Sequence, residues 1–242
     1  MREVWRELAG LLLPVDCAGC GRPRTELCAR CGRALARDGR GARRVRPWPA
    51  PAGLPRVWAG APYADEVRAV LLAHKERGAL PLTGPLGAVL AGAVRGLRAG
   101  GGPLLLVPVP SARRSVAGRG HDPVRRIARA AAGELRRAGT AARVLAVLRQ
   151  RRAVADQAGL SAPQRRANVA GALEVPGVAR RLLVGPPAVL VDDLVTTGAT
   201  LAEAARALAA AGGRVVGAAV VAAPVGAFAV DEAPLRALPR GR

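Results

Sequence analysis

The sequence predicts an α/β fold in which a parallel sheet carries helices on both faces, preceded by a small cysteine-bearing segment. Apolar runs of strand length alternate with helical patterns, as is typical of βαβ units. All four cysteines fall within residues 17–31. Half of the 242 residues are apolar and the mean hydropathy is +0.17, so the chain can bury a core of Ala, Val and Leu. We expect an N-terminal helix, cysteine segment and linker over 1–55, and the α/β domain over 56–242.

Each expected element follows from its own pattern. A short amphipathic helix covers 3–12 and Pro14 ends it, while 38–55, rich in Gly, Pro and Arg and without periodicity, is predicted to be a linker. Gly78 and Gly139 stand where two later helices are expected to end. The elements expected after the linker are helices at 64–77 and 85–98, a strand at 104–110, a helix at 123–138, a strand at 143–148, a polar loop at 149–168, a strand at 188–193, a helix at 199–211 and a strand at 214–223.

The charge is strongly positive and unevenly distributed. The formal net charge is +21, from 38 basic and 17 acidic side chains, and Lys75 is the single lysine. Residues 101–186 carry +12, whereas residues 187–242 are neutral. A GC-rich coding bias would produce the arginine excess, and a solvated helix face is compatible with its location. The more specific interpretation of this charge is that the protein handles phosphates or nucleic acid.

No window offers the roughly 20 uninterrupted apolar residues of a membrane helix, so we expect no membrane insertion. The apolar stretch near the N-terminus is interrupted by Glu3 and Glu7, and no cleavage site follows it, which argues against a signal peptide. Asp16, directly before Cys17, argues against a lipoprotein anchor. We therefore expect a cytoplasmic protein.

The cysteines form two C-x-x-C pairs, Cys17/Cys20 and Cys28/Cys31. Each pair lets two thiolates bind one ion from a tight turn, and four thiolates suit tetrahedral Zn²⁺ with no open coordination position. The segment is too small to bury its own core, so a structural zinc would supply folding energy. A redox dithiol, or two disulfides in a secreted protein, are the alternatives.

The stretch AVLVDDLVTTGATL, residues 188–201, predicts a buried strand, a loop and the start of a helix. Free N–H groups at a helix N-terminus favour a phosphate, Gly198 permits close backbone approach, and Thr196, Thr197 and Thr200 add hydroxyl donors. Asp192 and Asp193 would repel a phosphate but suit vicinal hydroxyls or Mg²⁺. A phosphate and a diol at one site indicate a ribose 5-phosphate. The alternative is an ordinary strand end with a threonine cap.

This stretch resembles the phosphoribosyl pyrophosphate (PRPP) signature of type I phosphoribosyltransferases. The resemblance implies that Asp192 and Asp193 bind the ribose hydroxyls as catalytic residues, with Mg²⁺ accompanying PRPP. It also implies a role in binding the 5-phosphate for a run of loop and helix residues: Val195, Thr196, Thr197, Gly198, Ala199 and Thr200. The implied fold is that of type I phosphoribosyltransferases.

Further positions along the chain match one family pattern in order: Lys75, Val107 to Pro110, Arg113, Arg119-Gly120, Gln157, Leu160, Arg165 and Asn168. With these positions, nearly the whole chain is similar to the ComF family, which joins a zinc-binding N-terminus to such a domain. The sequence departs from the family at His121, Asp122 and Pro123, where members have Phe, Asn and Gln. The resemblance implies a role in DNA uptake by competent bacteria, with a helicase partner on single-stranded DNA.

Three functions stay open. The first is a PRPP-dependent transferase with an unidentified acceptor, in which Arg113, Arg114 and Arg119 hold pyrophosphate and a polar stretch with Arg165 acts as a lid. The second is a non-catalytic protein that binds single-stranded DNA, although only five aromatic residues are available for stacking. The third is a PRPP-sensing regulator. No general base is evident, because His74 and His121 are expected to be packing or surface residues.

Overall fold

A computed structural model describes residues 15–36, 41–97, 102–111, 120–152 and 161–231. The expected helix at 3–12 lies outside these residues, as do Arg113, Arg114 and Arg119. The sheet has six strands in the order β1-β2-β8-β7-β3-β4, and all neighbours are parallel except β1 and β2. The strands are β1 (Arg43–Val45), β2 (Val57–Pro62), β3 (Leu104–Pro108), β4 (Ala142–Val144), β7 (Ala188–Leu194) and β8 (Val215–Ala223).

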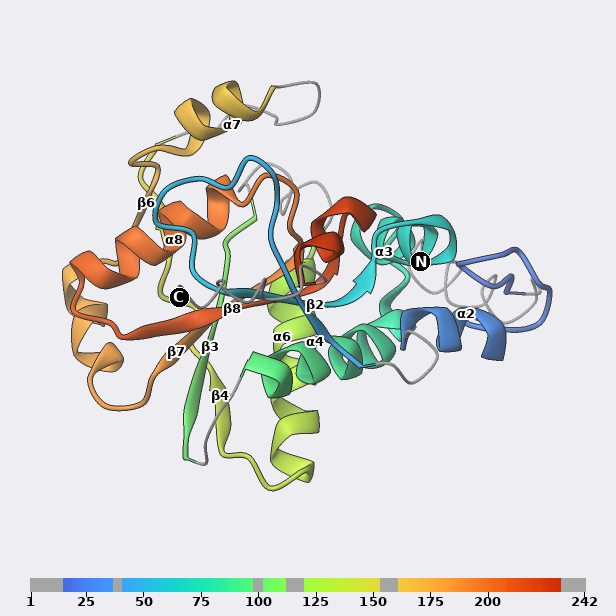
Figure 1. Cartoon of the computed structure of the whole chain (residues 1–242). Coiled ribbons are helices and arrows are strands. Elements are labelled where there is room, and N and C mark those ends of the chain that lie inside the picture. Colours follow the sequence, from blue (N-terminus) through green and yellow to red (C-terminus); the bar gives the residue numbers. More distant parts are fainter. Residues whose placement is uncertain (1–14, 37–40, 98–101, 112–119, 153–160, 232–242) are drawn as a thin grey trace, which may run out of the picture.

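Helices cover both faces of this sheet, which confirms the predicted fold class (Figure 1). On one face lie α3 (Asp65–Glu76), η2 (Leu80–Leu82), α4 (Thr83–Leu97) and α6 (Pro123–Arg137). On the other lie α8 (Ala199–Ala210) and η3 (Gly177–Leu183). The helix α2 (Ala29–Leu35) follows the second cysteine pair, and η4 (Val225–Asp231) follows β8.

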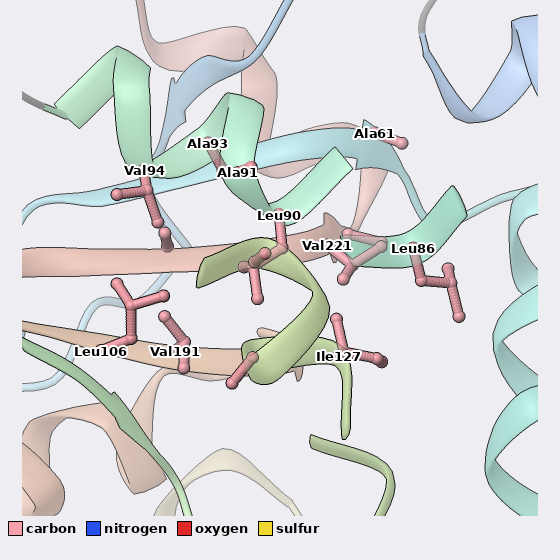
Figure 2. Close-up of a cluster of buried hydrophobic side chains, with 14 of the residues drawn as sticks. Ala61, Leu86, Leu90, Ala91, Ala93, Val94, Leu106, Ile127, Val191 and Val221 are labelled. Atoms are coloured by element: carbon pink, nitrogen blue, oxygen red, sulfur yellow. The ribbon is translucent and has the colours of Figure 1, made fainter. Parts of the chain in front are cut away.

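The central strand β7 shows why its sequence is continuously apolar. Val189 and Val191 point into the core cluster shared with α4 and α6, part of which is drawn in Figure 2. Ala188 and Leu190 point into the opposite cluster, shared with α8. A parallel strand covered on both faces needs such a run. The same alternation places Asp192 and Asp193, at the end of the strand, on opposite faces of the sheet.

Small residues let the helices approach closely in a core with few aromatic rings. A Cβ atom added to Gly87 of α4 would overlap the side chain of Ala130 on α6. Leu86, Leu90 and Ile127 fill the remaining space and are at most 1% exposed. Close backbone contact therefore takes the place of aromatic packing between α4 and α6.

Three segments differ from the sequence prediction. Residues 57–62 form β2 although no strand was expected there, because VWAGAP is too rich in small residues to give a strand pattern. β1 lies within the expected linker, and its three residues gain strand structure by pairing with β2. The strand expected at 143–148 ends at Val144.

The expected loop at 149–168 also contains regular structure. β5 (Arg149–Gln150) pairs with β6 (Leu173–Glu174), and α7 (Ala162–Val169) lies between them. α7 begins with a capping box, in which the side chains of Ser161 and Gln164 each accept a backbone N–H of the other residue. The capping box, rather than an apolar stripe, is the local signal for this polar helix.

In the described part of the chain, Leu80–Leu97 is the one helical run long and apolar enough to cross a membrane, with a mean hydropathy of 1.3. Seven residues of α4 within this run are buried in the α/β core. Length and composition alone do not separate a core helix from a membrane span. The burial fits a core helix, and cytoplasmic localisation stays a prediction.

Candidate functional site

The loop after β7 forms a hollow at the carboxyl edge of the sheet, and its lining contains every residue of the predicted phosphate loop. Val195 anchors the loop, because it is 2% exposed and its N–H donates to the carbonyl of Ala222 on β8 at 3.1 Å. Thr196 is exposed, whereas Thr197 and Thr200 are half-buried. The lining residues are Asp192, Leu194, Val195, Thr196, Thr197, Gly198, Ala199, Thr200 and Leu201.

Gly198 makes the turn into α8 with a left-handed backbone, at φ +77°. This conformation favours glycine. A side chain would also require Leu54 to move, because a Cβ atom at this position would lie 2.9 Å from Cδ1 of Leu54. Leu54 belongs to the connection between β1 and β2, which arches over the start of α8 in Figure 1. The predicted phosphate loop therefore packs against a segment that is distant in sequence.

Asp192 is the carboxylate that faces the hollow. Its Oδ1 accepts a hydrogen bond from the N–H of Asp193 at 2.8 Å. Burial, together with the negative charge of Asp193, raises the pKa of Asp192 well above its ordinary value, against the opposing effect of Lys75. A carboxylate under this electrostatic stress would be stabilised by a cation or by hydroxyl donors.

Asp193 lies on the other face and is paired with Lys75. Lys75 Nζ is 2.9 Å from Asp193 Oδ2, and the side chain of Asp193 is only 8% exposed. Burial lowers the pKa of Lys75, but the charge of Asp193 outweighs it and the pKa is raised. The structure thus gives the two adjacent carboxylates different surroundings, although the sequence suggested one shared role.

The two histidines meet beside this ion pair. Their rings pack edge to face, with centroids 6.1 Å apart, and His74 Nε2 lies 3.1 Å from the hydroxyl of Thr83. Burial lowers the pKa of His74 to about 4, helped by the nearby charge of His121. A neutral, nearly inaccessible imidazole agrees with the expected packing role of His74.

The residues that depart from the ComF pattern also have structural roles. Asp122 is the N-cap of α6, and its Oδ1 accepts from the N–H of Arg125 at 3.1 Å. Pro123 occupies the first position of the helix, where its missing N–H costs nothing. His121 contacts His74. Asp122 and Pro123 therefore give α6 a well-capped start.

A buried acid on α8 connects the hollow to the segment that carries Arg165. Glu203 is 6% exposed, accepts the N–H of Leu173 at 3.0 Å, and is paired with Arg206 at 2.7 Å. Arg206 also donates to the carbonyl of Leu173 at 3.1 Å. These contacts fix β6 to α8, the helix that begins at the predicted phosphate loop. The sequence carries a signal for it, because Glu203 interrupts the buried stripe of Ala199 and Ala207.

We call the described residues 149–152 and 161–175 the arm. Arg151 pairs with Glu174 at 3.3 Å, and a guanidinium N–H of Arg152 donates to the carbonyl of Ala170 at 2.8 Å. Arg165 is half-buried on α7 and does not line the hollow. Gln157 and Leu160, which matched the family pattern, lie outside the described residues.

The four cysteines converge as their spacing predicts. Their Sγ atoms all lie within 4.8 Å of one another, and those of Cys20 and Cys28 are 3.6 Å apart. Tetrahedral coordination with Zn–S bonds of about 2.3 Å would place sulfur atoms roughly 3.8 Å apart. All four thiols are free, so the two disulfides of the alternative interpretation are not formed. The donor set and its size fit one structural Zn²⁺.

The cluster contains a thiol that is already easily ionised. Burial raises the pKa of Cys17, but backbone hydrogen bonds, including the N–H of Cys28 at 3.3 Å, outweigh it and lower the pKa to about 6. Burial raises the pKa of Cys31, and the neighbouring thiols add to the increase. Since a metal binds thiolates, a cation in this cluster would offset the cost of ionising Cys31.

Residues 125–235 match the family model of the phosphoribosyl transferase domain. The matched range contains β7, the loop, α8 and β8, whereas the cysteine segment, α3 and β3 lie before it. No curated protein matches the chain. The match confirms the resemblance at the level of a phosphoribosyl transferase domain, and membership of the ComF family stays a prediction.

Proposed function

We propose that the protein is a ComF-like phosphoribosyltransferase that binds PRPP with Mg²⁺ at the hollow after β7. The observation that carries this proposal is the lining of the hollow. The hollow places the carboxylate of Asp192, whose pKa is raised, next to the threonine-rich N-terminus of α8. This pairing lies inside the range matched by the phosphoribosyl transferase family. A ligand with both a diol and a phosphate would offer hydroxyl groups to Asp192 and a phosphate to the N-terminus of α8.

The 5-phosphate would bind at residues 195–200, where helix N–H groups and hydroxyls are available. The ribose hydroxyls would donate to Asp192. Asp193, which is paired with Lys75 on the other face of the sheet, would support Asp192. The protein's contribution to catalysis is mainly positioning, so that the C1–O bond to pyrophosphate breaks as the acceptor attacks C1 and pyrophosphate leaves.

The carboxylate oxygen of Asp192 fits Mg²⁺, which prefers oxygen ligands and keeps several waters. When bound with PRPP, Mg²⁺ would neutralise pyrophosphate charge. Arg113, Arg114 and Arg119 follow β3, the parallel neighbour of β7, and their sequence position supports a role in holding pyrophosphate at the same sheet edge. We assign the arm, with Arg165, the role of a lid.

Ligand-induced stabilisation of the full chain tests this proposal. PRPP with Mg²⁺ should raise the melting temperature of the wild type, because a ligand that binds only the native state stabilises it. The double variant Asp192→Asn/Asp193→Asn should lose the shift. Asp122→Asn, which keeps a competent N-cap away from the hollow, is the matched control and should retain it. A wild type that shows no shift would refute the proposal.

A non-catalytic role in binding single-stranded DNA, with a competence helicase as partner, is the second candidate. It is favoured by Trp48, which is 88% exposed and lies close in sequence to the exposed Arg44 and Arg46. An exposed indole beside cations is what base stacking on a single strand requires. Trp48→Ala should then weaken DNA binding by about 1–3 kcal/mol. Binding that is insensitive both to this change and to salt would contradict this candidate.

A further inference from the structure

The cysteine cluster and the helix that carries Lys75 share one hydrophobic interface. α2 begins directly after Cys28, contains Cys31 and packs against α3. Leu35, the last residue of α2, is 2% exposed and belongs to the same core cluster as Val67 of α3. The cysteine segment is therefore not an independent appendage, because its own helix completes the packing of α3.

Polar contacts reinforce this interface at the first turn of α3. Arg30 NH1 lies 3.1 Å from Glu66 Oε1. The hydrogen bond from Arg30 to the Cys20 thiol, and the charge of Glu66, both raise the pKa of Arg30. Arg30 thus bridges a cysteine of the cluster and an acid of α3. The first cysteine turn also lies close to α3 at Gly19, since a Cβ atom on this residue would lie 3.3 Å from Cβ of Glu66.

The opposite end of α3 reaches the carboxylate pair. Glu66 stands in the first turn of α3 and Lys75 in its last turn, where it contacts Asp193. A helix of this kind is stiff over its 12 residues, so movement at one end is transmitted to the other. A continuous series of contacts therefore leads from the cysteines through α2 and α3 to the residue beside Asp192.

We infer that a metal ion in the cysteine cluster and PRPP in the hollow bind cooperatively, with α3 as the connecting element. The inference rests on the proposed function. A short segment that depends on metal for its fold would lose α2 when the metal leaves, and α3 would lose the surface that fixes Lys75. Without Lys75, Asp193 would add an uncompensated negative charge next to a site for a phosphorylated ligand. Metal binding should thus strengthen PRPP binding.

Thermodynamic linkage makes this testable in both directions. If bound zinc increases the affinity for PRPP, then PRPP must increase the affinity for zinc by the same factor. We expect a factor of about ten, within the usual range for coupled sites. The zinc affinity of the full chain is measured by competition with a chelator, with and without PRPP and Mg²⁺. Lys75→Met should abolish the difference while leaving the zinc affinity without PRPP unchanged.

A second comparison uses only folded, zinc-loaded protein. Glu66→Lys places two cations at the interface of α2 and α3 but keeps every cysteine and Lys75. It should weaken PRPP binding several-fold with zinc content unchanged. Glu134→Lys, which reverses a charge in a surface pair on α6, should leave PRPP binding unchanged.

The outcomes separate the two proposals. PRPP binding with equal zinc affinity in its presence and absence overturns the linkage alone. Wild-type PRPP affinity in Glu66→Lys likewise counts against α3 as the connecting element. A zinc-loaded protein that does not bind PRPP overturns the proposed function and the linkage with it.

Discussion

Lys75 Nζ lies 2.9 Å from Oδ2 of Asp193, so the single lysine of the chain neutralises the more deeply buried of two adjacent carboxylates. The pair joins α3 to the end of β7, two elements more than 100 residues apart in sequence. Asp192 is left facing the hollow, with Asp193 and Lys75 behind it. This arrangement supports our proposal that Asp192 binds the ligand and that Asp193 supports it.

Lys75→Met is expected to lower the free energy of unfolding by about 2 kcal/mol or more, because it leaves Asp193 buried without its cation. Chemical denaturation at neutral pH measures the loss. Asp193→Asn should rescue part of it in the double variant, since no charge then remains to be compensated. If the two single changes add without any interaction energy, the ion pair does not stabilise the protein.

The contrast between Asp192 and Asp193 illustrates what could be predicted from the sequence. The motif at 188–201 indicated the strand, the loop and the helix, because each depends on local pattern, and the C-x-x-C spacing indicated the convergence of four thiols. The partner of Asp193 depends on how α3 packs, which no local pattern specifies. Lys75 was selected only through the ComF resemblance, and its contact with Asp193 emerged from the structure.

Other contacts escaped prediction for the same reason. Leu54 lies in a proline-rich stretch without periodicity, yet it packs against Gly198. β1 and β2 lack a strand pattern and owe their structure to pairing with each other and with β8. Residues 149–168 were expected to be a loop because α7 has no apolar stripe, and only its capping box marks it as a helix. Long-range packing decided the contact of Leu54 and the pairing of β1 and β2, whereas the capping box of α7 is a local signal.

Gly198→Ala should destabilise the protein by about 1–3 kcal/mol, since alanine must adopt a left-handed backbone. The added methyl group must also displace Leu54, whose Cδ1 would be 2.9 Å away. Thermal or chemical unfolding measures the change, and PRPP affinity should fall with it. Gly133→Ala on α6 is the control, because nothing lies within 4 Å of a Cβ atom there. An equal effect at both positions would contradict the special role of Gly198.

Stability should fall as the pH is lowered through the titration of His74. Burial lowers its pKa from 6.5 to about 4, so the unfolded chain binds a proton in this range that the folded protein does not. The contribution is fully present above pH 6.5 and lost progressively down to pH 4, by about 3 kcal/mol in total. The free energy of unfolding, measured by denaturation at several pH values, should depend less on pH in His74→Gln than in the wild type. The same dependence of the unfolding free energy on pH in both proteins would show that the pKa of His74 is not lowered.

Glu203→Gln is expected to loosen the arm without disturbing the core. Glu203 Oε1 accepts hydrogen bonds from the N–H of Leu173 at 3.0 Å and from the guanidinium of Arg206. The guanidinium of Arg206 also donates to the carbonyl of Leu173. A neutral amide cannot accept both donors with the same strength, so about 1–3 kcal/mol of local stability should be lost. Hydrogen exchange at β6 should accelerate by roughly tenfold or more, while exchange in β3 and β7 stays slow. Glu134→Gln, which breaks an exposed pair of the same i,i+3 spacing, should leave β6 unchanged. Equal protection of β6 in both variants would mean that the arm is held to α8 by its apolar contacts rather than by the contacts of Glu203.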